Sequence, residues 1–275
     1  MKNHHKIIIS ISSDIGFYLA KDWLNLGVQV SGTYRTWSNK CDELLKLGAK
    51  LIQCDLGDIK SIDDSIRELN KNNKWDDLIV ATGSQEPIGN FSDCNIEVWS
   101  NSIDVNFTSQ IRFIHGLLPN RNLEDSCVPS VLMFAGGGTN SATIDYSAYT
   151  ISKIASIKMI ELLDAEINDT TFSILGPGWV KTKIHDATLQ SKEVAGDNYF
   201  KTLDMLDKNG EKCNPMEDVI NCCNWILSSD RELVGGRNFS LVFDPWDSKE
   251  IEKIRDDSNN FKLRRFGNEI FQENE

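Results

Sequence analysis

The 275-residue sequence predicts an α/β fold: a single domain built on a doubly wound parallel sheet with helices on both faces. Two observations lead to this prediction. Short apolar runs alternate with longer stretches whose apolar residues recur at helical spacing. The apolar runs also lack alternation between apolar and polar residues, which is typical of parallel strands buried on both faces. No repeat or linker interrupts this rhythm, so we expect one continuous sheet.

The first unit is predicted to be a strand, a turn and a helix. The run KIIIS at 6–10 is the strand, and apolar residues from Phe17 to Leu24 then keep helical spacing until Gly27 ends the helix. The elements that follow are a strand at 28–33, a helix at 41–47 closed by Gly48, a strand at 50–54, a helix at 61–69 and a strand at 77–81. This order is that of the Rossmann type of doubly wound sheet.

The second half keeps the same rhythm. Between 185 and 214 the helical period weakens, and two interpretations stay open: a flap over a site, which we place at 183–215, or an ordinary surface loop. We expect the domain to span 1–246 and a charged, partly helical C-terminal extension to occupy 247–275. The other predicted elements are a helix at 98–118, a strand at 130–134, a helix at 149–167, a strand at 171–175, a helix at 216–227 and an apolar run at 239–243.

Composition disfavours several classes of protein. Forty-one acidic residues against 29 basic ones give a net charge of −12, which makes nucleic acid a poor partner. No segment approaches the apolar length of a membrane span, and three isoleucines near the N-terminus are too short for a secretory signal, so we expect a cytoplasmic protein without a membrane partner. Seven cysteines without C-x-x-C spacing and four scattered histidines predict no metal site.

The turn after the first strand is a candidate dinucleotide site. In doubly wound proteins this helix N-terminus offers free backbone N–H groups to a pyrophosphate. Of three expected glycines only the last is present, and we expect Asp14 to sit at the helix N-cap, facing away from phosphate. The alternative is an ordinary capped helix that binds no nucleotide. The candidate binding residues of this turn are Ser10, Ser12, Ser13, Asp14, Ile15 and Gly16.

The end of the second strand bears on the choice of cofactor. An acidic residue there would bind the adenosine ribose of NAD, whereas an arginine accommodates the additional phosphate of NADP. The segment Thr33-Tyr34-Arg35 has no acid and contains Arg35. We therefore predict NADP rather than NAD, the alternative being that Arg35 is a solvated surface charge.

Tyr149 and Lys153 carry the strongest chemical signal. Four residues apart at the start of a predicted helix, they share one helical face, and the ammonium is expected to lower the phenol pKa from its usual value near 10 toward an acid/base range. They follow the fifth strand, at the edge where such sheets bind ligands.

From Lys6 to Asp244 the chain resembles the short-chain dehydrogenase/reductase family. The resemblance rests on the order of SSDIG at 12–16, CDLGD at 54–58, ATGS at 81–84, VNF at 105–107, YTISK at 149–153, LGPGWVKT at 175–182 and VGGRNFSLVFD at 234–244. It implies hydride transfer between a nicotinamide cofactor, NADP or NAD, and a carbonyl or alcohol substrate. Tyr149 would donate or accept the proton, Lys153 would hold the ribose and tune the phenol, and Asn106 would anchor a water of the proton relay.

The family also implies the remaining cofactor contacts and the assembly. Compact members commonly form homodimers or homotetramers, which we expect here. The contacts implied beyond the first turn and Arg35 are Asp55, Leu56, Ala81, Thr82, Gly83, Tyr149, Lys153, Pro177, Gly178, Val180 and Thr182.

One departure from the family lies in the predicted active site. The position of the family's usual serine, which donates a hydrogen bond to the substrate oxygen, is Gly136 here. Loss of such a donor typically costs about 10²- to 10³-fold in rate. We hypothesise that Thr139 supplies the hydroxyl instead. Tyr146 is interpreted as a substrate-side or packing residue.

The glycine triplet at 136–138, VFDPW at 242–246 and FKLRRF at 261–266 resemble family members linked to carbohydrate metabolism, which suggests a sugar or a sugar derivative as substrate. An exposed Trp179 could stack on a sugar ring, or it could pack under the flap. Two other functions stay open. The missing serine and glycines would suit a non-catalytic nucleotide-binding or regulatory protein, and a sugar epimerase or dehydratase would use the cofactor only transiently.

Overall fold

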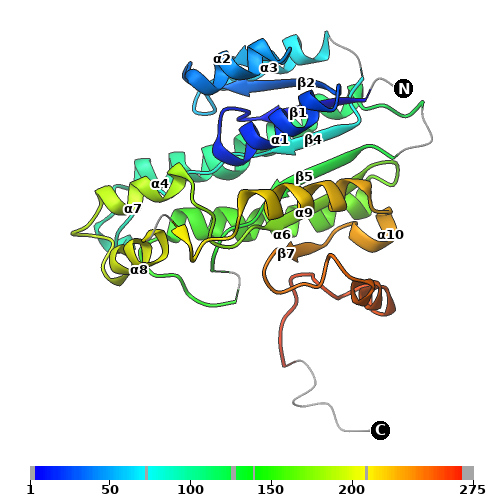
Figure 1. The fold of residues 1–275 in the computed structure, drawn as a ribbon. Coiled ribbons are helices and arrows are strands. Elements are labelled where there is room, and N and C mark those ends of the chain that lie inside the picture. The colour runs from blue at the N-terminus through cyan, green and yellow to red at the C-terminus, as the bar shows by residue number, and fades with distance from the viewer. Residues whose placement is uncertain (1–3, 72–73, 125–127, 139, 208–209, 268–275) are drawn as a thin grey trace, which may run out of the picture.

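The sheet has seven parallel strands in the order β3-β2-β1-β4-β5-β6-β7. A computed structural model describes residues 4–71, 74–124, 128–138, 140–207 and 210–267. Figure 1 shows the strands from β2 at the top of the view to β7 below. The chain crosses from β1 to β3 on one side and from β4 to β7 on the other, so the ligand crevice of a doubly wound sheet is expected where β1 meets β4. The strands are β1 (His5–Ile9), β2 (Gln29–Tyr34), β3 (Lys50–Gln53), β4 (Asp77–Val80), β5 (Ser130–Phe134), β6 (Thr171–Gly176) and β7 (Asn238–Ser240).

The first strand shows why the sequence encodes a sheet with two covered faces. Ile7 and Ile9 are buried in one hydrophobic cluster, and Ile8 between them is buried in the other. Because neighbouring strand residues point to opposite faces, an unbroken apolar run needs a covering layer on each side. The helices α1 (Asp14–Asn25), α2 (Asn39–Lys46) and α9 (Met216–Ser228) cover one face, and α3 (Ile59–Asn70), α5 (Ser109–Leu117) and α6 (Ser147–Glu166) cover the other.

The helix predicted at 98–118 is not a uniform α-helix. It begins earlier, as α4 (Ile96–Ile103), widens into a π-helical turn, η2 (Asp104–Thr108), continues as α5 and ends in the 3₁₀ turn η3 (Leu118–Asn120). The π-helical turn contains the buried Asn106. Such turns inside a longer helix are frequent at functional sites.

The segment of weak periodicity at 185–214 contains helices that the sequence did not predict. They are α7 (Asp186–Gln190), which follows the 3₁₀ turn η4 (Lys183–His185), and α8 (Asp197–Leu206). In Figure 1 both lie beyond the carboxyl ends of the strands, on the side of the sheet's ligand edge. α7 has only five residues, and the single buried residue of each helix is a threonine, so neither helix has a row of buried apolar residues to give a strong periodic signal.

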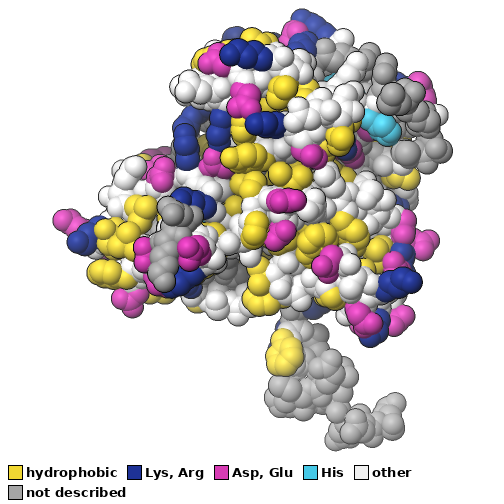
Figure 2. Space-filling model, in the orientation of Figure 1, with side chains coloured by type: hydrophobic (Ala, Val, Ile, Leu, Met, Phe, Trp, Pro, Cys, Tyr) yellow, Lys and Arg dark blue, Asp and Glu magenta, His cyan; other side chains and the backbone are white. Residues whose placement is uncertain are grey.

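The chain beyond β7 partly joins the core. After a four-residue helix, α10 (Arg231–Val234), and β7, the 3₁₀ helix η6 (Lys249–Asp256) buries Ile251 and Ile254 in the cluster that contains α1 and α9. Only Asn238–Ser240 of the apolar run at 239–243 is strand. Figure 2 shows acidic and basic side chains interspersed over the visible face. No helix within the described residues is both long and apolar enough to cross a membrane.

Candidate active site

A cavity of about 1400 Å³ opens at the carboxyl ends of the strands. The residues predicted to bind the cofactor all line it, except Gly16, which is buried beneath the turn. A pocket for one drug-sized ligand typically measures about 300–1,000 Å³, so this space suits a dinucleotide together with a substrate. Thr139, the predicted substitute for the serine, lies outside the described residues.

The turn before α1 keeps the packing of a phosphate-binding turn without all its glycines. A Cβ on Gly16 would lie 2.7 Å from the Ser10 carbonyl oxygen, so the helix approaches the strand as closely as glycine allows. Ser10 adopts a φ of 65°, in the region that favours glycine, and its hydroxyl lies 2.6 Å from that of Thr82. The turn therefore keeps a glycine-like φ at Ser10 and a close approach of α1 to β1 at Gly16.

The prediction that Asp14 is the N-cap of α1 was wrong. Ser13 is the N-cap and accepts a hydrogen bond from the Gly16 N–H at 3.2 Å. Asp14, the first helical residue, instead accepts from the Lys183 N–H at 2.7 Å and forms an ion pair with Lys40. Its carboxylate therefore ties the segment after β6 to α1 at the edge of the cavity. This is the one feature of the turn that opposes a phosphate, and Lys40 partly offsets it.

Arg35 follows β2, is exposed and lines one end of the cavity. The Gln53 side-chain amide donates to the Arg35 carbonyl at 3.3 Å, which links the ends of β2 and β3. Asp55 accepts from the Gly57 N–H at 2.9 Å and shapes the loop after β3. This end of the cavity thus offers one arginine and no carboxylate from β2.

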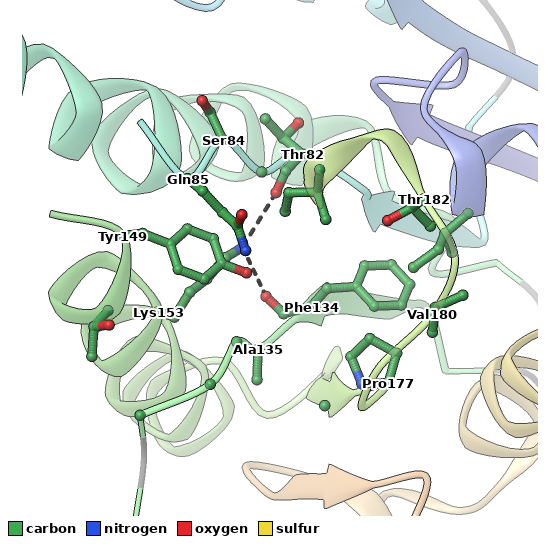
Figure 3. A pocket seen from close by; sticks show the side chains of 18 of the residues that line it. Thr82, Ser84, Gln85, Phe134, Ala135, Tyr149, Lys153, Pro177, Val180 and Thr182 are labelled. Carbon is green, nitrogen blue, oxygen red and sulfur yellow. Dashed lines mark hydrogen bonds between the residues drawn. The ribbon is translucent and has the colours of Figure 1, made fainter. Parts of the chain in front are cut away.

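Tyr149 and Lys153 both come from the first turns of α6 and face this cavity (Figure 3). Lys153 is 2% exposed, and its ammonium donates to the carbonyl oxygens of Phe134 at 3.0 Å and Thr82 at 3.2 Å. It lies 5.7 Å from the centre of the Tyr149 ring. The strand ends of β4 and β5 thus hold the ammonium in place next to the phenol.

The pKa of Tyr149 departs from its usual value in the direction opposite to the prediction. Burial raises the pKa of Tyr149 to about 12 and lowers the pKa of Lys153 to about 8. The loss of hydration disfavours both charged forms, and the ammonium hydrogens are directed at two carbonyls rather than at the phenol oxygen. At neutral pH the phenol therefore holds its proton.

Gly136 explains the missing serine in steric terms. A Cβ at this position would lie 2.7 Å from the Tyr149 hydroxyl and 2.8 Å from its ring carbon Cε1. The Tyr149 side chain therefore fills the space in which a side chain at 136 would begin. No residue larger than glycine fits there unless the phenol moves.

Asn106 lies outside the cavity, at its wall. It is fully buried, its Oδ1 accepts from the Ser84 N–H at 2.8 Å, and its Nδ2 donates to the Ser84 carbonyl at 2.9 Å and to the Ser102 hydroxyl at 3.1 Å. Its amide thus fixes the segment after β4. The anchoring of a water by Asn106 stays a prediction.

The sequence reasoning missed several polar residues of the cavity, among them Gln85 and Thr188, which bond to each other. The Tyr146 hydroxyl lies 2.7 Å from the Thr188 hydroxyl, which donates to Gln85 Oε1 at 2.9 Å. These three residues lie on separate segments, so no local motif signals their contact. Gln85 and Thr188 therefore join the candidate site only through the tertiary structure.

Trp179 is half-buried, and its ring stacks on that of His185 with centroids 4.9 Å apart. His185 shares a hydrogen bond of 3.0 Å with the Val180 carbonyl, and burial lowers its pKa, which keeps the ring neutral. The indole is thus packed against the segment after β6. Of the two interpretations of Trp179, the structure favours packing.

Comparison with known proteins places this geometry in a family. A family model described as "Enoyl-(Acyl carrier protein) reductase" matches residues 10–241. A Dictyostelium discoideum protein, "Dehydrogenase/reductase SDR family protein 7-like", is 27% identical over 247 residues, covering 84% of this chain and 72% of that protein. An uncharacterized oxidoreductase of Staphylococcus epidermidis is 23% identical over 192 residues, covering 68% of this chain and 83% of that protein.

Solved structures share the fold. A short-chain dehydrogenase/reductase from Saccharomyces cerevisiae superposes with a TM-score of 0.76 at 18% identity, covering 88% of this chain and 97% of that one. A Shigella flexneri protein described as a short-chain dehydrogenase complexed with NADP gives 0.72 at 16% identity, covering 88% and 98%. With a family model matching most of its length, this chain belongs to the short-chain dehydrogenase/reductase family of oxidoreductases.

Proposed function

We propose that this protein is an NADP-dependent oxidoreductase that transfers a hydride between the nicotinamide and a carbonyl or alcohol carbon. The observation that carries the proposal is that Tyr149 and Lys153 line the same continuous cavity as the turn before α1 and Arg35. A proton donor, a buried ammonium and a phosphate-binding turn thus share one space. That arrangement suits a redox nucleotide with a substrate at its reactive end.

The residues present fit such a cofactor. The turn before α1 would hold the pyrophosphate, Arg35 the additional phosphate of NADP, and the segment 177–182 the nicotinamide. When bound, NADPH supplies the hydride. Lys153 would meet the ribose, and the Tyr149 hydroxyl would give its proton to the substrate oxygen. Because the phenol pKa is about 12, Tyr149 is protonated at neutral pH, which suits carbonyl reduction.

A sugar or a sugar derivative is our proposed substrate class. Among the described side chains that line the cavity are the hydroxyls of Tyr146, Thr188 and Thr202 and the amides of Gln85 and Asn198. Uncharged hydroxyl and amide groups are suited to a neutral, hydroxyl-rich molecule. We further propose cytoplasmic localisation and a homodimeric or homotetrameric assembly, as the family resemblance implies.

Titration of nicotinamide fluorescence tests the cofactor. We expect the wild type to bind NADPH more tightly than NADH. Arg35→Ala should weaken the binding of NADPH about tenfold or more and leave the affinity for NADH unchanged. Arg67→Ala is the matched control, because Arg67 is an exposed arginine on α3, outside the cavity. If neither nucleotide binds, the enzymatic proposal fails.

Loss of NADPH absorbance with a panel of aldehydes, ketones and keto-sugars tests the reaction. We expect turnover that Tyr149→Phe lowers by about 10²- to 10⁴-fold, a far larger effect than this variant has on NADPH binding. Nucleotide binding without turnover on any member of the panel would contradict this proposal and favour the non-catalytic alternative, which the glycine at 136 and the acid at 14 support. Exchange of a substrate stereocentre without net NADPH loss would favour the epimerase.

A further inference from the structure

Residue 136 cannot supply a side-chain hydrogen-bond donor to the substrate oxygen. The position lacks a side chain, and the Tyr149 hydroxyl occupies the place where one would start. Under the proposed function, the substrate oxygen must nevertheless lie within reach of that hydroxyl. A second side-chain donor at this point therefore has to come from another residue that lines the cavity.

We propose that the side-chain amide of Gln85 is this second donor and binds the carbonyl oxygen of the substrate together with the Tyr149 hydroxyl. This inference rests on the proposed function. Gln85 follows β4, lines the cavity and is half-buried. In Figure 3 its side chain points into the same cavity as the ring of Tyr149. Gly83, two residues earlier, brings this segment close to the phenol: a Cβ there would lie 3.9 Å from Tyr149 Cε2.

The hydrogen bonds around Gln85 orient its amide. Thr188 gives its only hydroxyl proton to Gln85 Oε1 at 2.9 Å, so the Tyr146 hydroxyl must be the donor in the 2.7 Å contact with Thr188. With the oxygen engaged, the NH₂ group of Gln85 is the free end of the amide. Within the described part of the chain, no acceptor is bonded to that nitrogen. The two N–H groups of the Gln85 side-chain amide are therefore available to a ligand in the cavity.

The backbone on both sides of Gln85 is fixed as well. Asn106 bonds both the N–H and the carbonyl of Ser84, at 2.8 and 2.9 Å. The Ser102 hydroxyl donates to the Glu86 carbonyl at 2.6 Å, and Asn106 also donates to Ser102. The buried network of α4 and its π-helical turn therefore ends on the two neighbours of Gln85. A side chain that binds a reacting atom has to be held rigidly, and these bonds hold the backbone of Gln85 in that way.

Gln85→Leu removes the donor at similar size, and Gln190→Leu is the matched control, because Gln190 is an exposed glutamine at the same cavity. The non-reacting probe is isobutyramide, whose carbonyl accepts hydrogen bonds but is not reduced. Its binding to the NADPH complex is measured by nicotinamide fluorescence. We expect Gln85→Leu to weaken isobutyramide binding about tenfold and to leave NADPH affinity unchanged. Reduction of 4-nitrobenzaldehyde should fall about 10²- to 10³-fold in kcat/KM.

Variants of Thr188 test whether its hydroxyl positions the Gln85 amide. Thr188→Val should give a smaller loss in both readouts, and Thr188→Ser, which keeps the hydroxyl, should restore them. Three results would overturn the inference while NADPH still binds: a wild type that does not bind isobutyramide, a Gln85→Leu variant equal to the wild type, or equal losses in NADPH and isobutyramide affinity. If NADPH itself does not bind the wild type, the proposed function fails first and this inference with it.

Discussion

At the residue scale, the centre of the site depends on a glycine. Tyr149 stands where a Cβ on Gly136 would begin, whereas a Cβ on the next residue, Gly137, meets no atom of the described residues within 4 Å. Two adjacent glycines therefore have very different tolerance for substitution. Comparing substitutions at the two positions therefore distinguishes a steric requirement for glycine at 136 from a general requirement for a flexible loop.

Gly136→Ser, which introduces the serine usual in the family, is expected to lower activity rather than raise it. The new Cβ would displace the Tyr149 hydroxyl, and misplacement of a reacting group by about 1 Å can cost about 10²-fold. Turnover with NADPH is the measurement, and Gly137→Ser should stay near the wild-type rate. A faster Gly136→Ser enzyme would show that Tyr149 moves easily and that a hydroxyl at 136 is what the site lacks.

The buried ammonium of Lys153 predicts a pH dependence of stability. Its pKa is about 8 in the fold against 10.5 for an ordinary lysine, so between these values the unfolded chain binds a proton that the native protein does not. Stability from this group therefore rises with pH, by up to about 3 kcal/mol. Urea unfolding of the wild type and Lys153→Met, compared from below pH 8 to pH 10.5, should give a difference that grows in favour of the wild type. A flat or falling difference would contradict the burial of the charge.

At the element scale, α1 carries an acid where a phosphate is expected to bind. Asp14 bonds the Lys183 N–H and pairs with Lys40, and thereby joins α1 to the segment that leads into α7. The carboxylate stabilises this connection and at the same time opposes an anion. The two effects can be separated, because an asparagine keeps the acceptor oxygen and loses the charge.

Asp14→Asn is expected to tighten NADPH binding about fivefold, which corresponds to about 1 kcal/mol for one charge near a phosphate, with a smaller gain at high salt. Asp14→Ala also loses the bond to Lys183, so limited proteolysis should cut the segment 183–206 faster in this variant than in Asp14→Asn. Fluorescence titration measures the affinity. Weaker NADPH binding by Asp14→Asn would mean that the charge of Asp14 aids the site.

At the scale of the whole molecule, the sheet edge at β7 is covered by the chain that follows it. Figure 1 shows this C-terminal segment beyond β7. Ile251 and Ile254 of η6 enter the core, while Arg264 forms paired hydrogen bonds of 2.8 and 3.0 Å to Glu161 of α6. Arg264 thus joins the segment after β7 to α6.

The core contacts of this segment should contribute more to stability than its ion pair. Ile254→Ala is expected to lower the free energy of unfolding by about 2–4 kcal/mol, because Ile254 is 7% exposed and its removal leaves a cavity. Arg264→Ala should cost about 1 kcal/mol or less, because its side chain is 39% exposed. Urea unfolding measures both. Equal losses would indicate that the ion pair holds the segment in place.

The sequence alone predicted the doubly wound sheet, six of its seven strands near their observed positions, an apolar run where the seventh lies, and a set of cofactor contacts of which all but Gly16 line the cavity. These features are encoded locally: apolar runs such as the three isoleucines of β1 specify buried strands, and the carboxyl ends of parallel strands share one edge. The short helices α7 and α8 and the π-helical turn at Asn106 were not predicted, because their form depends on contacts with other elements.

Only the tertiary structure decided which side chains that are distant in the sequence come into steric contact or form hydrogen bonds. The Cβ of residue 136 competes with the Tyr149 hydroxyl, Asp14 bonds the backbone 169 residues later, and Thr188 bonds Gln85 across 103 residues. Burial, which no local pattern measures, moved the Tyr149 pKa upward although a lysine lies one turn away. Packing distance and desolvation arise only when the chain has folded, because both depend on what surrounds a residue in space.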